Sequence, residues 1–277
     1  MEAVPAVHPD ARSARTMFAV LHGTLAPHPW RDPESAEADA YSLFHARSSA
    51  MRLLTAAVEG ASGGVWGMND AGADSPVDAD SSRIAWFQVG ISDHAERFLP
   101  VQAFLSCADA VLERIGTSRL DAVQILLPLD PSGTPQQAVS DASATPGIAE
   151  AHWFADPDPG WRTEVRVTLD GGRSESPLAS VAATIAARIQ ETHQAVFACE
   201  SVSLAGESDL ALQPAAYAGV WPGPSSNRAT LHGTLTEWSL DAVGWLVGFL
   251  ADVVSQHSVS GDVMVTVSRN APISVRV

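Results

Sequence analysis

The chain spells one pentapeptide twice, and its histidine and threonine side chains are the residues most suited to chemistry. The copies span residues 21–25 and 231–235, and each reads Leu-His-Gly-Thr-Leu. In an extended strand, successive side chains point to opposite faces, so the His and Thr of each copy share one face. An imidazole titrates near neutral pH and can serve as a general acid or base. The copies could face a shared cleft, or they could be traces of an old duplication without chemistry.

Four residues of each copy resemble the paired His-x-Thr-x signature of the 2H phosphoesterase superfamily, in which two such strands face one cleft. The matching segments are His22-Gly23-Thr24-Leu25 and His232-Gly233-Thr234-Leu235, including the apolar last position. The resemblance implies that one histidine acts as general base toward a 2′-hydroxyl or water and the other as general acid. It also implies that the hydroxyls of Thr24 and Thr234 hold the phosphate.

A second group of side chains could bind a ligand without catalysing a reaction. Several tryptophans fall in loops or at the ends of expected elements, where filling a core does not obviously require them. Such rings could line a pocket for a small apolar or aromatic metabolite, although each ring could instead fix a loop to the body of the protein. The candidate ligand-binding residues are Trp30, Trp66, Trp221, Trp238 and Arg228.

The charge balance disfavours two classes of partner. The chain has 32 acidic and 16 basic residues, a formal net charge of −16. Nucleic acids and anionic membrane surfaces are bound by clusters of Lys and Arg, and the sequence has no basic run. All of the basic residues are Arg, which is typical of a GC-rich, actinobacterial genome. We therefore expect neither nucleic acid nor a membrane as a partner.

The spacing of the cysteines and the absence of several known sequence motifs disfavour metal and cofactor sites. The two cysteines, Cys107 and Cys199, lie in apolar periodic segments and form no metal-binding pattern, so we expect buried thiols and no metal. No Walker, GxGxxG, GxSxG or HExxH motif is present, and we expect no cofactor. The first residues lack the apolar core of a signal peptide, and the most apolar stretch, 240–254, is shorter than a bilayer span. These features predict a cytoplasmic protein.

The first half of the chain predicts the order β-α-β-β-α-β. Strands are expected at 17–25, 62–68, 83–91 and 120–129, the second of them weakened by two glycines. A helix is expected from the Asp32-Pro33 cap to Gly60, and a second over 101–115, before Gly116. The first half therefore carries its pentapeptide on its first strand.

The second half predicts the same order. Strands are expected at 164–169, 195–204, 228–235 and 262–268, with helices after Ser176-Pro177 and after Ser239. Gly244 and Gly248 on the last helix indicate close packing against another helix. This half carries its pentapeptide on its third strand, a position that is not equivalent to the first copy.

These patterns predict an α+β fold of tandem ferredoxin-like units, each an antiparallel sheet with two helices on one face. A length of 277 residues suits two units, and we place them at 15–130 and 161–277, with 131–160 as a linker. The expected function is binding of a small apolar or aromatic metabolite, in an accessory or tailoring role in small-molecule biosynthesis. The sequence leaves open whether the protein is an enzyme. The alternatives are 2H-like phosphoester cleavage by His22 and His232, and a homodimeric interaction protein without catalysis.

Overall fold

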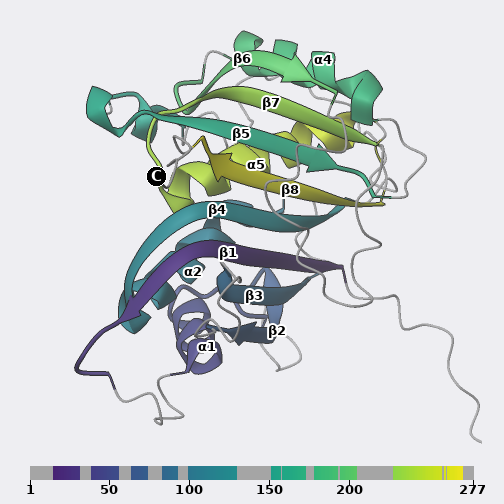
Figure 1. Cartoon of the computed structure of the whole chain (residues 1–277). Coiled ribbons are helices and arrows are strands. Elements are labelled where there is room, and N and C mark those ends of the chain that lie inside the picture. The colour runs from purple at the N-terminus through teal and green to yellow at the C-terminus, as the bar shows by residue number, and fades with distance from the viewer. Residues whose placement is uncertain are drawn as a thin grey trace, which may run out of the picture.

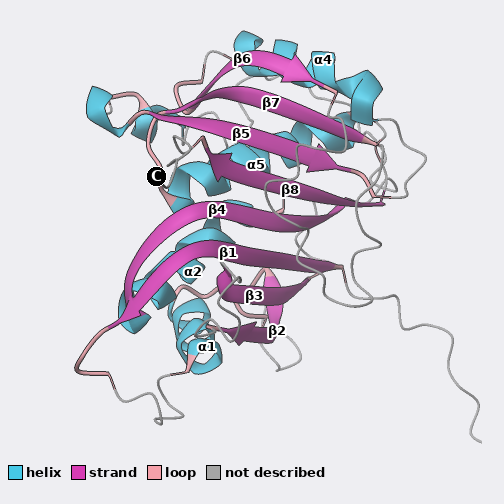
Figure 2. Cartoon of the chain, in the orientation of Figure 1, coloured by secondary structure: helices cyan, strands magenta, loops and turns pink. Residues whose placement is uncertain are grey.

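A computed structural model describes most of the chain between its termini. The described residues are 15–31, 39–55, 64–73, 83–92, 99–129, 151–156, 158–172, 178–192, 194–204, 227–257, 259 and 261–270. Within them the chain is α+β, with eight strands in one antiparallel sheet and four α-helices packed on it (Figures 1 and 2).

The elements of the first half follow the expected order β-α-β-β-α-β. They are β1 (Thr16–Pro27), α1 (Ala40–Ala50), β2 (Trp66–Gly72), β3 (Arg83–Ile91), α2 (Val101–Ile115) and β4 (Gly116–Leu129). The predicted bounds of β3 and α2 are confirmed. Helix α1 is much shorter than predicted, because Asp39 is in an extended conformation and caps the helix by accepting a hydrogen bond from the backbone amide of Ser42. The chain then leaves the helix through Arg52, which has a positive φ of 59°.

The second half repeats this order. After two short 3₁₀ turns, η2 (His152–Phe154) and η3 (Pro159–Trp161), it contains β5 (Thr163–Asp170), α4 (Leu178–Glu191), β6 (Phe197–Ser203), β7 (Arg228–Leu235), α5 (Leu240–Gln256) and β8 (Gly261–Arg269). The predicted cap of α5 is confirmed, since the Ser239 side chain accepts a hydrogen bond from the amide of Ala242. The Ser176-Pro177 cap and most of the proposed linker lie outside the described residues.

The two halves share one sheet, whereas we expected a separate sheet for each. The strand order is β2-β3-β1-β4-β8-β5-β7-β6, so each half contributes four adjacent strands in equivalent order. Strands β4 and β8 join the halves, pairing antiparallel from Ala122 opposite Ser268 to Leu129 opposite Gly261. The β4–β8 pairing joins segments that are far apart in the chain, and the residue pattern within one segment does not indicate its partner strand.

All four described helices pack on the same face of this sheet, because their buried residues share one core with it. Figure 1 shows α2 and α5 behind the strands. Alternate strand residues such as Leu21, Val123, Val167 and Val265 are fully buried in one continuous core with the helices. The period of two along each strand puts the remaining residues on the opposite face. That face carries a separate small cluster of Phe18, Val20, Leu126 and Met264, with Trp86 packed against it.

Helices α2 and α5, one from each half, pack closely at the glycines noted in the sequence. A Cβ added to Gly244 would lie 2.8 Å from the Cα of Gln102, whereas a Cβ at Gly248 would lie 3.9 Å from the Cβ of Val101. The expected close packing of this helix is therefore confirmed, and Gly244 is the point of closest approach. The Gln102 side chain also donates a hydrogen bond to Asp241 at 2.7 Å.

Alanine substitutions at the two glycines should change stability in opposite directions. Gly244→Ala forces backbone apart and should lower the free energy of unfolding by about 1–3 kcal/mol, as overpacking does. Gly248→Ala meets only ordinary contacts and should raise it by up to about 1 kcal/mol, through helix propensity. Urea denaturation of both variants measures this difference, and equal stabilities would contradict the packing described.

Candidate functional site

The pentapeptides place their histidines on the same face of the sheet but far apart along it. His22 lies on β1 and His232 on β7, both on the face opposite the helices, and the two strands are separated by β4, β8 and β5. Four strand spacings of about 4.8 Å put the histidines about 19 Å apart. This separation is too long for both imidazoles to act on one phosphoester, so the structure does not bring the expected acid–base pair together.

The threonines of the two copies also lie on different strands and in different surroundings. Thr24 is exposed near the end of β1, and the Thr234 hydroxyl donates a hydrogen bond to the Glu200 carboxylate at 3.0 Å. A hydroxyl bonded to a carboxylate is oriented away from the role of holding a phosphate. The four residues of the expected catalytic set therefore occupy two unrelated surroundings.

The glycine within each copy has a structural reason. Gly23 follows a bulge in the pairing of β1 with β4 and has a φ of 151°, where a Cβ would collide with the Arg119 carbonyl. A Cβ at Gly233 would collide with the Ala198 carbonyl and the Phe197 ring. The leucines of both copies face the helices or pack against the core on that side. Packing thus accounts for three of the five repeated positions.

His22 itself is nearly buried and held by a defined hydrogen bond. Its Nε2 lies 3.1 Å from the Oε1 of Gln124, whose own amide nitrogen donates to the Thr266 hydroxyl. The direction of that second bond makes Oε1 the acceptor and His22 Nε2 the donor. Burial lowers the pKa of His22, the bond to Gln124 opposes this shift, and the positive charge of Arg83 adds to it. His22 is therefore neutral over a wider pH range than a free histidine.

The predicted tryptophans lie in separate parts of the fold. Trp66 is fully buried at the start of β2, edge-on to Phe104, which makes it a core residue and not part of a loop-lined pocket. Trp30 is 71% exposed and stacks on the His28 ring. Trp221 lies outside the described residues. The described rings in this set do not converge on one pocket.

Trp238 connects the two halves. It is half-buried, its indole nitrogen donates to the Leu120 carbonyl at 2.9 Å, and the guanidinium of Arg269 lies 5.8 Å from its ring centroid. Leu120 belongs to the first half and Trp238 to the second. These contacts fit the alternative in which a tryptophan fixes a connecting segment to the body of the protein.

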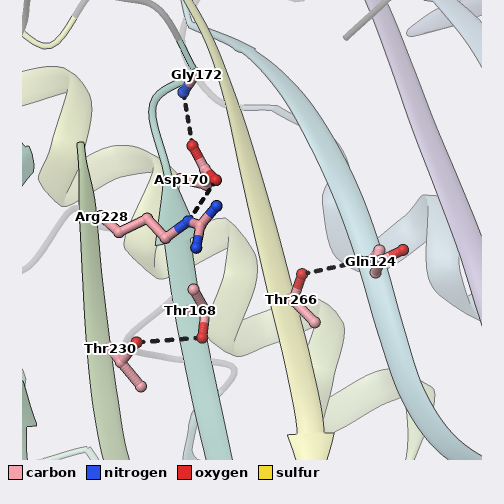
Figure 3. A network of polar contacts seen from close by, with 7 residues as sticks. All are labelled: Gln124, Thr168, Asp170, Gly172, Arg228, Thr230 and Thr266. Carbon is pink, nitrogen blue, oxygen red and sulfur yellow. Dashed lines mark hydrogen bonds and ion pairs between the residues drawn. The ribbon is translucent and has the colours of Figure 1, made fainter. Parts of the chain in front are cut away.

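Arg228 is held in a buried ion pair. Its Nε lies 2.6 Å from a carboxylate oxygen of Asp170, and the two side chains are 5% and 6% exposed. The other Asp170 oxygen accepts a hydrogen bond from the Gly172 amide at 2.8 Å (Figure 3). Asp170 lies at the end of β5 and Arg228 at the start of β7, directly opposite each other. Arg228 thus links β5 and β7 through its ion pair with Asp170, and its expected role in ligand binding stays a prediction.

Sequence reasoning missed an ordered array on the sheet face opposite the helices, where residues line up in three cross-strand rows. The first row is His22, Ala122, Ser268, Arg166 and His232. The middle row is Val20, Gln124, Thr266, Thr168 and Thr230. The third row is Phe18, Leu126, Met264, Asp170 and Arg228.

The three rows change from apolar to polar across the sheet. The β1 and β4 side carries Phe18, Val20 and Leu126, whereas the β5 and β7 side carries hydroxyls and charges. In the middle row the hydroxyls of Thr168 and Thr230 lie 3.3 Å apart. Figure 3 shows them pointing toward each other from neighbouring strands. The alternation of polar with apolar residues in 164–170 and 228–235 indicates that these strands have one polar face. The alignment of that face into rows depends on the register between strands, which the sequence pattern does not indicate.

Two searches of the described residues bear on other functions. No three or more His, Cys, Asp or Glu side chains gather there in a way that could hold a metal ion. Among the helices of the described segments, none combines the length and apolar character that crossing a bilayer requires. Comparison of the chain with protein-family models, curated proteins and solved structures found no match in any of the three.

Lowering the pH should destabilise the protein through His22. Because the folded pKa of His22 is lowered, the unfolded chain takes up the proton first, and stability is lost as the pH falls below the unfolded value of about 6.5. His22→Gln removes this proton-linked loss, so its free energy of unfolding should depend less on pH between 7.5 and 5.5. Urea denaturation at both pH values tests this, with the same replacement at exposed His257 as control. An unchanged pH dependence in His22→Gln would contradict it.

Removing either partner of the Asp170–Arg228 ion pair should lower the free energy of unfolding by about 3–5 kcal/mol, because the remaining charge stays buried without its partner. Asp170→Asn and Arg228→Met are the single variants, and their combination removes both charges. The double variant should lose clearly less stability than the sum of the two single losses, which denaturation of all four proteins measures. Additive losses would show that the pair is not coupled.

Proposed function

We propose that this protein binds a small apolar or aromatic molecule on the sheet face opposite the helices. The single observation that carries the proposal is the arrangement of the three rows. They put the half-buried ring of Trp86, which packs on the buried cluster of Phe18, Val20, Leu126 and Met264, in line with the half-buried hydroxyls of Thr266 and Thr168. Ligand sites characteristically combine an apolar wall with a few fixed polar groups in this way.

The polar groups on this face are held in place before any ligand arrives. Gln124 is 2% exposed and bonded to both His22 and Thr266, and Thr230 is 1% exposed beside Thr168. Thr266, Thr168 and Trp86 are half-buried, so part of their surface is open to contact. Groups fixed in this way lose little conformational entropy on binding, which favours specific recognition.

The fold supports the same proposal at a coarser level. The strand order β2-β3-β1-β4 and its equivalent β6-β7-β5-β8 support a description of each half as a ferredoxin-like unit, the two joined edge to edge. Units of this kind carry their helices on one face of an antiparallel sheet, as this chain does in its described residues. The fold alone does not specify a ligand, so the proposal depends on the rows and not on the architecture.

A bulky side chain placed in the middle row should block binding. Thr266→Phe fills the half-buried face beside Gln124, away from the helix-facing core, and should abolish binding of aromatic fragments. Thr184→Phe makes the same change on an exposed position of α4, on the other side of the sheet, and should leave binding intact.

The measurement is nuclear magnetic resonance of the methyl groups during titration with an aromatic fragment library. Methyl signals of Val20, Leu126 and Met264 should shift in the wild type and in Thr184→Phe, but not in Thr266→Phe. Shifts confined to methyl groups of the helix-facing core, or equal shifts in both variants, would overturn the proposed site.

A further inference from the structure

The packing of α1 on α2 brings a thiol, a thioether and a hydroxyl together at the C-terminal end of α1. Cys107 on α2 is buried, and its thiol donates to the thioether sulfur of Met51 at 3.5 Å. Ser48 lies three residues before Met51, on the same face of α1, and its hydroxyl contacts the same thiol. Met51 directly follows α1 and is 38% exposed. The cluster therefore reaches from the helix contact to the protein surface.

This cluster has more hydrogen-bond donors than good acceptors. Ser48 is 0% exposed, and among the described residues its hydroxyl has no hydrogen-bond partner of normal geometry. Burying a hydroxyl in this way is unfavourable. The thioether sulfur of Met51 is only a weak acceptor for the Cys107 thiol. An S–H and an O–H donor thus lie together at a place that lacks a strong acceptor.

Met51 is the sulfur atom of this cluster that an oxidant reaches most easily. Met17 and Met264 are 0% and 3% exposed, and oxidation of methionine follows exposure. Burial raises the pKa of the Cys107 thiol, and the Ser48 hydroxyl and the charge of Arg47 oppose this rise only in part. A buried, protonated thiol reacts poorly with peroxides. Accessibility and protonation therefore both favour reaction at Met51.

We propose that Met51 is a site of reversible oxidation by hydrogen peroxide, and that Cys107 and Ser48 hold the oxygen that it gains. The peroxide O–O bond breaks and an S–O bond forms at Sδ. The thioether sulfur loses two electrons, one peroxide oxygen becomes the sulfoxide oxygen, and the other leaves with both hydrogens as water. The site lies on the helix side of the sheet, so this inference is independent of the proposed function.

The sulfoxide supplies the acceptor that the cluster lacks. Its oxygen is strongly polar, and rotation about the Cγ–Sδ bond of Met51 turns it toward the Cys107 thiol and the Ser48 hydroxyl. Oxidation of methionine commonly disrupts packing, because a polar group enters apolar surroundings. Here two donors offset that cost, so the oxidised side chain keeps the end of α1 attached to α2.

The first measurement locates the oxidation. The full chain is treated with hydrogen peroxide, and peptide mass spectrometry follows each methionine over time. Met51 should be converted at least about tenfold faster than Met17 and Met264, and methionine sulfoxide reductases should restore it. Equal rates at these three methionines would overturn the proposal. Oxygen uptake by Cys107 in place of Met51, detected as a sulfenic acid with dimedone, would also overturn it.

The second measurement tests the donors by thermal unfolding before and after oxidation. Ser48→Ala removes a buried hydroxyl that lacks a partner, so the Tm of the reduced variant should equal or exceed that of the wild type. After oxidation this variant lacks one donor to the sulfoxide. Oxidation should therefore lower its Tm by about 2–3 °C more than it lowers the Tm of the wild type.

Two matched variants serve as controls. Ser49→Ala makes the same replacement at the next residue, which is exposed, and should show the wild-type change in Tm on oxidation. Met51→Leu treated with peroxide measures the contribution of the other methionines, which is subtracted. An equal loss of Tm on oxidation in the wild type and in Ser48→Ala would show that the hydroxyl does not hold the oxygen, and would overturn the proposed site.

Discussion

The pairing of β4 with β8 is the interaction on which the rest of the structure depends. It joins two four-stranded halves edge to edge and removes one exposed edge from each of them. On one side of this junction, α2 and α5 pack together at Gly244, and Trp238 bonds across the halves to Leu120. The junction thus lets the two halves share one continuous core on the helix side of the sheet.

A consequence of this junction is an extended sheet face on which no helix of the described segments packs. The period of two along each strand gives this face every second residue of the strands, and antiparallel pairing aligns those residues in rows. Near the junction Gln124 and Thr266 bond across the β4–β8 pair itself. The polar array therefore depends on the same strand pairing that holds the halves together, which links the candidate site directly to the stability of the fold.

The residues of the repeated pentapeptide are explained by different structural requirements. Its leucines and glycines serve packing and close backbone approach, and these requirements act on both copies. Its histidines meet different surroundings, one nearly buried against Gln124 and the other half-buried beside Ser203. The non-equivalent strands expected for the two copies are those observed, β1 and β7, and the four strand spacings between these strands separate the imidazoles.

The sequence by itself determined the elements and their order, because periodicity, caps and glycine positions act over a few residues. Strand β7, helix α2 and the Ser239 cap could all be assigned in this way. Only the tertiary structure decided which residues became neighbours. The contact of Trp66 with Phe104, the Asp170–Arg228 ion pair and the pairing of Arg166 opposite His232 each join segments far apart in the chain. Such contacts depend on strand order and register, which non-local hydrogen bonds and core packing set together.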